Sequence, residues 1–174
     1  MELPGPARAS YSPSVTDTCD LPTTDADWRE PAVIRRLLTT PATWAVVGLS
    51  NNTARTAHSI ARFLRCRLGM TTVPVHPRAE TVEGVPGYAR LADVPSPEDG
   101  GPGPIEVVDC FLNSSRVGAV VDEAIAEAER LGIRAVWLQL GVIDEAAALR
   151  ARKAGLDVVM DTCPAIEAPR LRVE

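Results

Sequence analysis

The sequence predicts an α/β protein with a doubly wound, mainly parallel, Rossmann-like sheet in a three-layer α/β/α arrangement. From Trp44 onward, short apolar segments rich in β-branched residues alternate with segments of helical periodicity. Three of the expected helices end in a glycine, at Gly69, Gly132 and Gly155, and each glycine leads into an apolar strand. This alternation is typical of a parallel sheet covered by helices on both faces, with right-handed crossovers.

Periodicity and turn residues place the individual elements. Pro31 suits the first turn of a short amphipathic helix. Helices are predicted at residues 31–40, 54–69, 115–132 and 145–155. Strands are predicted at residues 44–48, 71–75, 103–111, 134–140 and 156–160. Ser114 and Asp144 are expected to cap the last two helices, and Trp137 and Met160 are expected to lie in the core.

The length of 174 residues argues for one domain. Residues 1–24 are rich in Pro, Ser, Thr and Asp and carry few large apolar side chains. We therefore expect a disordered or loosely attached leader, followed by the folded domain at residues 25–174.

Composition excludes several classes of function. The net charge of −5 argues against a nucleic-acid partner, since proteins that bind nucleic acids usually carry clustered positive charge. The sequence has no long apolar run and no signal-peptide core, so we expect no membrane span and a cytoplasmic location. Four cysteines, at positions 19, 66, 110 and 163, form no C-x-x-C pair. We expect reduced thiols and no metal site.

In a sheet of this kind the ligand lies beyond the carboxyl ends of the strands, near the switch in strand order. The residues that follow the predicted strands are therefore the candidates for function. These segments are residues 48–55, 76–78, 112–114, 139–142 and 161–167.

The segment VVGLSNNTAR joins the first predicted strand to its helix. Gly48 allows a tight turn toward a helix N-terminus, which is a natural anion site. Ser50 and Asn51 can add donors, and Arg55 adds a positive charge. Ser50 and Thr53 replace two glycines of the dinucleotide fingerprint, so that motif is broken. Alternatively, Gly48 only makes a strand–helix turn and Asn51 caps the helix.

The second predicted strand is followed by His76, Pro77 and Arg78, with no acid among them. Dinucleotide-binding folds commonly place Asp or Glu there to hold ribose hydroxyls. A basic residue suits another phosphate better than a free ribose diol. The alternative for Arg78 is a solvated cation in a loop.

Candidates for catalysis are few. The chain has two histidines, His58 and His76, far apart in sequence, and no recognisable hydrolase, metalloprotease or Walker A motif. His58 falls within a predicted helix, where packing or surface exposure is the simpler interpretation. Cys163 follows the last predicted strand, where a ligand could reach it, although an inert, half-buried thiol is the alternative.

Motifs from Trp44 to Leu171 resemble the small CoA-binding protein family, a single Rossmann-like domain similar to the CoA-binding domain of the succinyl-CoA synthetase α subunit. The similar segments include AVVGLSNNTAR, VPVHPR, GYARLADVP and VDCF. The most specific are WLQLGV followed by VVMDTCPAIE. The resemblance implies that residues 25–174 form a CoA-binding Rossmann-like domain.

The resemblance also implies a CoA or acyl-CoA ligand whose phosphates lie near the first turn. The predicted ligand-binding residues are Gly48, Ser50, Asn51, Arg55, His76, Pro77, Arg78, Asn113, Ser114, Gln139, Gly141, Val142 and Cys163. Pro164 and Glu167 also match the terminal motif. The family commonly has Arg at the positions of Leu112 and Thr162, and Ser-Tyr where this chain has Ala57 and His58, so fewer cations are available here to hold a polyanion.

The leading hypothesis is non-catalytic binding of CoA or an acyl-CoA, a small-molecule partner, with no nucleic acid, no membrane and no assigned protein partner. One alternative is a sensor of NAD or another adenine nucleotide on the same fold. A second alternative is an enzyme that uses Cys163 as a thiol nucleophile on acyl-CoA. Fold similarity alone establishes no reaction.

Overall fold

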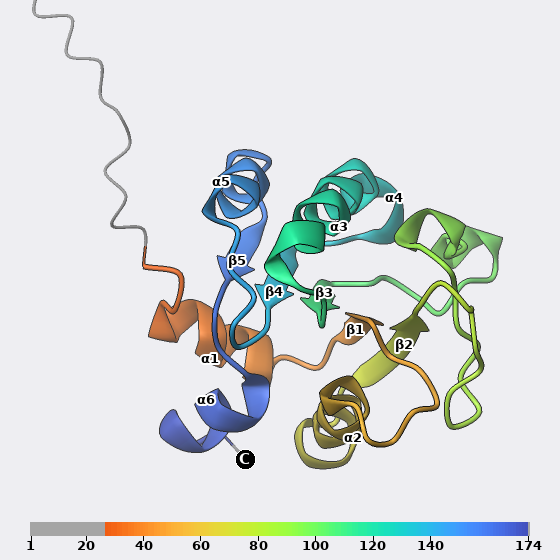
Figure 1. Ribbon diagram of the computed structural model, residues 1–174, viewed down its shortest axis with the longest axis horizontal. Helices are drawn as coiled ribbons and strands as arrows, with labels where there is room; N and C mark the ends of the chain where they lie inside the picture. Colours follow the sequence, from red (N-terminus) through yellow and green to blue (C-terminus); the bar gives the residue numbers. More distant parts are fainter. Residues whose placement is uncertain (1–26, 174) are drawn as a thin grey trace, which may run out of the picture.

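The computed structural model describes residues 27–173, and the predicted leader at residues 1–24 lies outside them. A five-stranded, all-parallel sheet runs through the centre of the molecule (Figure 1). The strands are β1 (Thr43–Val47), β2 (Thr71–Val75), β3 (Val107–Cys110), β4 (Ala135–Leu138) and β5 (Asp157–Val159). Their order in the sheet is β2-β1-β3-β4-β5. The predicted fold class is confirmed.

Helices cover both faces of the sheet (Figure 1). On one face lie α3 (Ser114–Ala126), the single turn α4 (Ala128–Leu131) and α5 (Glu145–Lys153). On the other face lie α1 (Pro31–Thr39), α2 (Thr56–Leu68) and α6 (Pro164–Arg170). Two 3-10 turns, η1 (Leu91–Asp93) and η2 (Pro97–Asp99), belong to the long connection between β2 and β3.

Alternating strand residues supply two separate apolar layers because successive side chains point to opposite faces. Ala45 and Val47 of β1 pack into the cluster under α3 and α5. Trp44 and Val46 pack into the cluster under α1, α2 and α6. In the second cluster the rings of Trp44 and Trp137 lie 5.6 Å apart between centroids. Trp137 and Met160 are both buried, as the sequence predicts.

The strand–helix turns use several of the predicted residues. Gly69 and Gly132 are left-handed C-caps, with φ of +67° and +81°. Gly155 follows Ala154, the C-cap of α5. The side chain of Asp144 accepts a hydrogen bond from the Ala147 N–H at 2.9 Å, so the predicted cap is confirmed.

The predicted cap at Ser114 is wrong, and so is the alternative in which Asn51 caps α2. Ser114 is the first residue of α3, and its hydroxyl accepts the N–H of Ile143 at 2.9 Å, bonding to the loop after β4. Asn51 does not cap α2, because the N-cap is Arg55 and the Asn51 side chain donates to the carbonyl of Thr81. Both polar side chains find partners that are far away in sequence.

The helix predicted at residues 115–132 is divided at Glu127 into α3 and α4. The sequence-based interpretation did not include α6. This helix has only seven residues and contains Pro169, so it lacks a periodic apolar signal long enough to identify it.

The connection after β2 runs back along the edge of the sheet. Tyr88 donates its N–H to the carbonyl of Pro74, and its own carbonyl accepts the N–H of His76. These bonds cover the outer edge of β2. They also carry the chain to Arg90, at the end of the sheet where the ligand site was expected.

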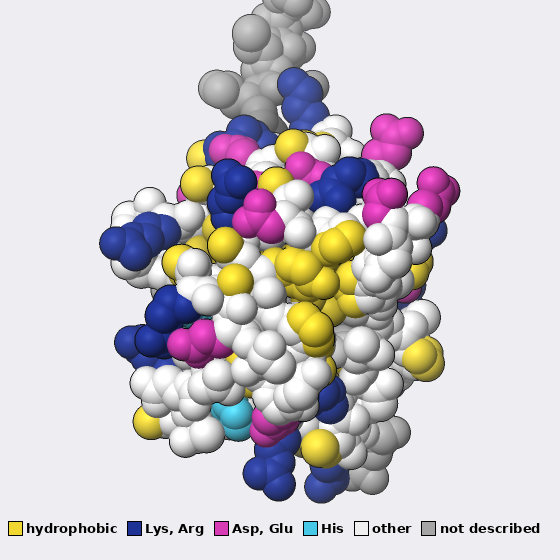
Figure 2. All heavy atoms as spheres, turned by 90° about the vertical axis from the view of Figure 1, so that its right-hand side faces the viewer, with side chains coloured by type: hydrophobic (Ala, Val, Ile, Leu, Met, Phe, Trp, Pro, Cys, Tyr) yellow, Lys and Arg dark blue, Asp and Glu magenta, His cyan; other side chains and the backbone are white. Residues whose placement is uncertain are grey.

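Figure 2 shows one face of the molecule, on which acidic and basic side chains lie among one another around a hollow where hydrophobic side chains gather. Within residues 27–173, no helix is both long and apolar enough to cross a bilayer. The same residues contain no group of three or more His, Cys, Asp and Glu side chains that could hold a metal ion.

Candidate ligand-binding site

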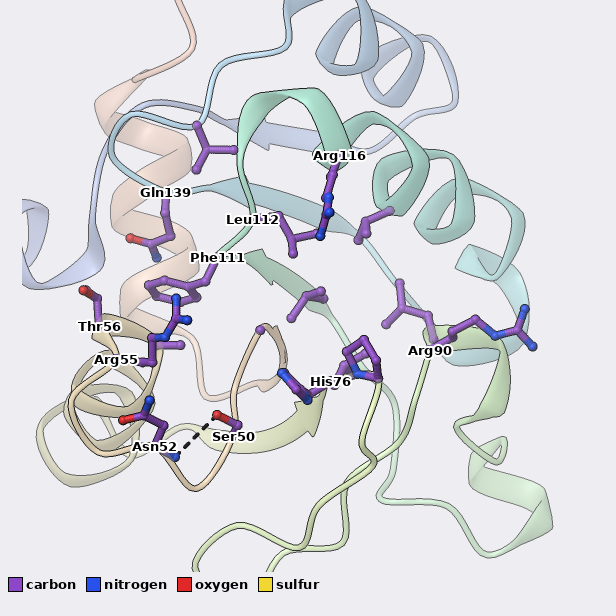
Figure 3. A pocket seen from close by; sticks show the side chains of 18 of the residues that line it. Ser50, Asn52, Arg55, Thr56, His76, Arg90, Phe111, Leu112, Arg116 and Gln139 are labelled. Atoms are coloured by element: carbon purple, nitrogen blue, oxygen red, sulfur yellow. Dashed lines mark hydrogen bonds between the residues drawn. The ribbon is translucent and has the colours of Figure 1, made fainter.

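A cavity of about 940 Å³ opens beyond the carboxyl ends of β1, β2, β3 and β4 (Figure 3). From β1 the chain passes to β2 on one side, and later returns to β3 on the other side. The cavity therefore lies at the switch in strand order, where open α/β sheets bind their ligands.

The turn after β1 requires glycine. Gly48 has φ of +99°, which is unfavourable for residues with a side chain. A Cβ atom at this position would lie 2.8 Å from the carbonyl oxygen of Phe111. The Gly48 N–H donates to the carbonyl of Val75 at 2.8 Å. The end of β1 is thus held against the end of β2, through Val75, and against the end of β3, through Phe111.

The N-terminus of α2 faces the cavity with free donors. The N-cap residue Arg55 provides no side-chain cap. The N–H groups of Thr56 and Ala57 make no hydrogen bond to another described residue. Arg55, Thr56 and Ala57 all line the cavity, and Arg55 forms no ion pair within residues 27–173. Free N–H groups and the helix dipole favour an anion here.

Ser50 and Asn51 have different positions. Ser50 is buried at the cavity wall, and its hydroxyl accepts the Asn52 N–H at 3.4 Å (Figure 3). Asn51 does not line the cavity. The Asn51 N–H donates to Glu80 at 3.0 Å, and Glu80 also pairs with Arg78 at 3.0 Å. Glu80, the first acid in the chain after β2, thus binds the turn between β1 and α2.

Two further arginines reach the cavity from other elements. Arg90 comes from the connection after β2, and Arg116 comes from the first turn of α3 (Figure 3). Arg90 pairs with Asp93 at 3.3 Å, whereas Arg116 has no ion pair in the described part of the chain. Sequence reasoning missed both arginines. Arg116 lies two residues beyond the candidate segment 112–114, and a longer segment that continued into the predicted helix would contain it.

One part of the wall is apolar. It includes Phe111, Leu112 and Val120, and it continues to Leu140 and Ile166 at the mouth of the cavity. Leu140 is 61% exposed and Ile166 is 48% exposed. Such exposure of large apolar side chains next to a cavity is typical of a surface that contacts a ligand or partner.

The two positions at which the family commonly has Arg have different surroundings. Leu112 lines the cavity. Thr162 is buried away from it, and its hydroxyl donates to Glu167 at 2.6 Å. Only the residue at position 112 therefore bears directly on the charge of the cavity.

The cavity has a polar floor formed by Gln139. This side chain is 4% exposed, and its Nε2 donates to Oδ1 of Asp109 at 2.7 Å. Asp109 is fully buried on β3. Burial raises the pKa of Asp109 to about 8, and the hydrogen bond from Gln139 opposes only part of this rise. The carboxyl group is therefore mostly protonated at neutral pH.

Cys163 lines the cavity at the start of α6 but is only 8% exposed. Burial raises the pKa of its thiol, although the N–H groups of Ala165 and Ile166 act in the opposite direction. The thiol form is favoured at neutral pH, whereas nucleophilic cysteines need the thiolate.

The cavity brings together most of the residues predicted from the sequence. Those that line it are Gly48, Ser50, Arg55, His76, Pro77, Arg78, Gln139, Val142 and Cys163. Four predicted residues do not line it: Asn51, Asn113, Ser114 and Gly141.

The residues outside the cavity have structural contacts. Asn113 is exposed and accepts a hydrogen bond from the hydroxyl of Ser115 at 2.8 Å. Gly141 donates its N–H to Asp161 at 2.8 Å. The Gly141 bond and the bond from Ile143 to Ser114 hold the loop after β4 in place.

Known proteins share this architecture. A hypothetical protein from Pyrococcus horikoshii OT3 superposes with a TM-score of 0.70 and is 31% identical, covering 82% of this chain and 92% of its own. The uncharacterized protein YneT of Bacillus subtilis strain 168 is 28% identical over 132 residues, which is 76% of this chain and 89% of YneT.

A larger protein contains a similar domain. The dinucleotide-forming acetyl-coenzyme A synthetase 1 of Ca. Korarchaeum cryptofilum has a TM-score of 0.56 at 22% identity. The match covers 71% of this chain but only 26% of the synthetase, and the likeness concerns the fold alone. Residues 42–169 of the present chain match the protein family described as the CoA binding domain. The chain belongs to this CoA binding domain family.

Proposed function

We propose that the protein binds CoA or an acyl-CoA in this cavity, with the diphosphate against the turn between β1 and α2, and that it has no catalytic activity of its own. The observation that carries the proposal is the uncapped N-terminus of α2 beside Arg55. Its free Thr56 and Ala57 N–H groups face a cavity of about 940 Å³. This size lies within the range of roughly 300–1,000 Å³ that is common for small-molecule sites.

Charge supports a ligand with several phosphates. Arg55 lies on one side of the cavity, and Arg116 and Arg90 lie on the other (Figure 3). Hydrogen bonds from arginine to phosphate are charge-assisted and can be bidentate. An anion at α2 also gains from the helix dipole. CoA, with a diphosphate and a separate 3′-phosphate, can use cations at two places.

The apolar wall supports the rest of the ligand. Phe111 and Leu112 lie between Arg55 and the two other arginines (Figure 3), and Val120 and the exposed Leu140 and Ile166 also line the cavity. The pantetheine arm and any acyl chain present methylene groups to such a surface. Burial of apolar area contributes about 25 cal/mol per Å².

The chemistry of the side chains favours binding without reaction. Burial keeps Cys163 in its thiol form. His58 does not line the cavity, and its Nε2 lies 3.5 Å from Glu83. Activated nucleophiles usually have a base within hydrogen-bond reach. Within residues 27–173, Cys163 has no hydrogen bond to a histidine.

NAD is the comparison ligand because an adenine-nucleotide sensor is the main alternative. An NAD site commonly has an acid at the end of β2 for the ribose hydroxyls. Here the residues after β2 are His76, Pro77 and Arg78, and Glu80 is engaged by Asn51 and Arg78. These contacts occupy the carboxylate nearest to the end of β2, which counts against its use for ribose hydroxyls.

The test is calorimetric titration and thermal unfolding with CoA and NAD at equal concentrations. CoA at ~100 times its dissociation constant should add about 2.7 kcal/mol of stability. For a domain of this size, that corresponds to roughly 5–10 °C in melting temperature. NAD should produce little change. An equal or larger shift with NAD would replace CoA by a dinucleotide.

Two charge-reversal variants locate the site. Arg55→Glu should abolish most of the CoA shift, since it places an anion at the proposed diphosphate position. Arg62→Glu is the matched control, because Arg62 is an exposed residue of the same helix that does not line the cavity. Equal effects of the two variants would show only a long-range charge effect and contradict the proposed position.

A further inference from the structure

We propose that Asp109 is a positioning residue of the ligand site. From beneath the cavity it holds the amide of Gln139 so that Gln139 Oε1 faces the ligand and accepts an N–H from the pantetheine arm. This inference rests on the proposed CoA binding and adds a specific donor group on the ligand. It gives a role to a buried acid that neither the turn between β1 and α2 nor the arginines of the cavity contact.

The register of the sheet places Asp109 directly below the cavity. Asp109 pairs with Val46 on β1 and with Trp137 on β4, so these three side chains share one face of the sheet. Gly48, Phe111 and Gln139 come two positions later in the chain, directly after the ends of the same three strands. These last three residues line the cavity. Since two residues of a strand span about 7 Å, Asp109 lies one layer of side chains below the floor.

The contact with Gln139 is short and well defined. Gln139 Nε2 donates to Asp109 Oδ1 at 2.7 Å in a buried environment. Figure 3 shows the Gln139 side chain on the same side of the cavity as Thr56 and Phe111. The amide nitrogen is therefore directed at the acid, and the amide oxygen of the same group is left for another partner.

The oxygen of that amide remains accessible. The buried side-chain atoms without a partner, within the described residues, are Trp44 Nε1, Thr72 Oγ1 and Asp109 Oδ2. Gln139 Oε1 is not one of these atoms, and no described residue donates a hydrogen bond to it. The oxygen is thus not fully buried, and it belongs to a residue that lines the cavity. It is an uncharged acceptor in a cavity whose lining also includes the carboxylate of Glu123.

Asp109 does not have the properties of a stabilising core residue. It is fully buried, its Oδ2 has no partner, and burial raises its pKa to about 8. An apolar side chain of similar size would avoid these costs. Perturbed acids of this kind are concentrated at functional sites. Support of a ligand-contacting side chain by a second residue behind it is a common way to fix its orientation.

The location of Gln139 indicates which part of CoA it contacts. Gln139 lines the cavity on the same side as Thr56 at the start of α2, where the diphosphate is proposed (Figure 3), and the next residue in the chain is Leu140 of the apolar wall. The arm that joins the diphosphate of CoA to its thiol carries two amide groups with N–H donors. An amide N–H of this arm is therefore the group that Gln139 Oε1 accepts.

Four variants test the inference by titration with CoA. Asp109→Asn keeps a carbonyl oxygen for Gln139 Nε2, so CoA affinity should stay within about twofold of the wild type. Asp109→Val and Gln139→Leu should each weaken binding by roughly 3- to 10-fold, the equivalent of one neutral hydrogen bond. The double variant Asp109→Val/Gln139→Leu should bind no more weakly than Gln139→Leu alone, because both changes remove the same interaction.

Thr72→Val is the matched control. Thr72 is buried on β2, and its Oγ1 is another side-chain atom without a partner in the described residues. This change also replaces a buried polar group by valine, but Thr72 does not line the cavity. CoA affinity should not change in this variant.

A second readout needs no ligand. In nuclear magnetic resonance spectra the Gln139 side-chain amide should show slow exchange in the wild type and in Asp109→Asn. The protection should be lost in Asp109→Val. This measurement reports the orientation of Gln139 even if the melting temperature of a variant changes.

The outcomes separate this inference from the proposed function. If the wild type binds CoA but the two losses add in the double variant, or if Asp109→Asn loses as much as Asp109→Val, the positioning role is wrong and CoA binding stands. Unchanged Gln139 protection in Asp109→Val would also overturn the positioning role. If the wild type does not bind CoA, both the proposed function and the pantetheine contact fail.

Discussion

Gly48 and Phe111 approach each other so closely that a Cβ atom on Gly48 would lie 2.8 Å from the Phe111 carbonyl oxygen. This approach joins the end of β1 to the end of β3, at the point where the strand order reverses. It places the first turn of α2 beside the aromatic wall of the cavity. The shape of the site therefore depends on a residue without a side chain.

Gly48→Ala should lower the free energy of unfolding by about 1–3 kcal/mol, because it adds backbone strain to a steric clash. Denaturant unfolding measures this loss. Gly69→Ala is the control, since Gly69 also has a positive φ but no atom lies within 4 Å of the added Cβ. If Gly69→Ala costs as much as Gly48→Ala, the contact with Phe111 has no energetic role.

Arg116→Glu should weaken CoA binding by at least about 10-fold, the lower limit for loss of a charge-assisted contact. Titration at two salt concentrations measures both the loss and the smaller salt dependence expected when one cation is removed. Arg134→Glu serves as the control because Arg134 is exposed before β4, at the opposite end of the sheet. Unaltered binding by Arg116→Glu would restrict the phosphate contacts to the α2 side.

Stability should depend on pH through Asp109. Its pKa is about 8 in the folded protein, compared with 3.8 for an aspartate in the unfolded chain. Between these values the folded state retains a proton that the unfolded state releases. The contribution of Asp109 to the free energy of unfolding is therefore complete below pH 3.8 and is lost as the pH rises to about 8. The limiting slope of this loss is about 1.4 kcal/mol per pH unit.

Asp109→Asn removes this titration but preserves the shape of the side chain. The free energy of unfolding of the variant, minus that of the wild type, should increase from pH 5 to pH 8 and then level off. Urea unfolding at each pH provides the difference, in which contributions of the other titrating groups cancel. A constant difference would mean that Asp109 does not carry a raised pKa.

Cys163 should react slowly with a thiol reagent at neutral pH because burial raises its pKa. Cys66 is exposed and should be modified first. Peptide mapping after brief treatment distinguishes the two sites, and bound CoA should slow Cys163 further, since this residue lines the cavity. Preferential modification of Cys163 would revive the hypothesis of a thiol-dependent enzyme.

Local sequence determined much of the fold. The alternation of apolar strands with helical segments identified the parallel sheet, and Asp144 identified the start of α5. These features depend on neighbouring residues and on interactions that span a few positions, so they can be recognised without tertiary information. The same reasoning placed the ligand site at the carboxyl ends of the strands, where the cavity lies.

The tertiary structure decided which side chains meet there. Ser114 could have capped its own helix, but the loop after β4 supplies Ile143 as a partner instead. Arg90 reaches the cavity from a connection in which Tyr88 binds the edge of β2. Asp109 and Gln139 are 30 positions apart, and the register of β3 and β4 brings them together. Such contacts depend on strand order and on the route of a long connection, which the periodicity of a single segment does not encode.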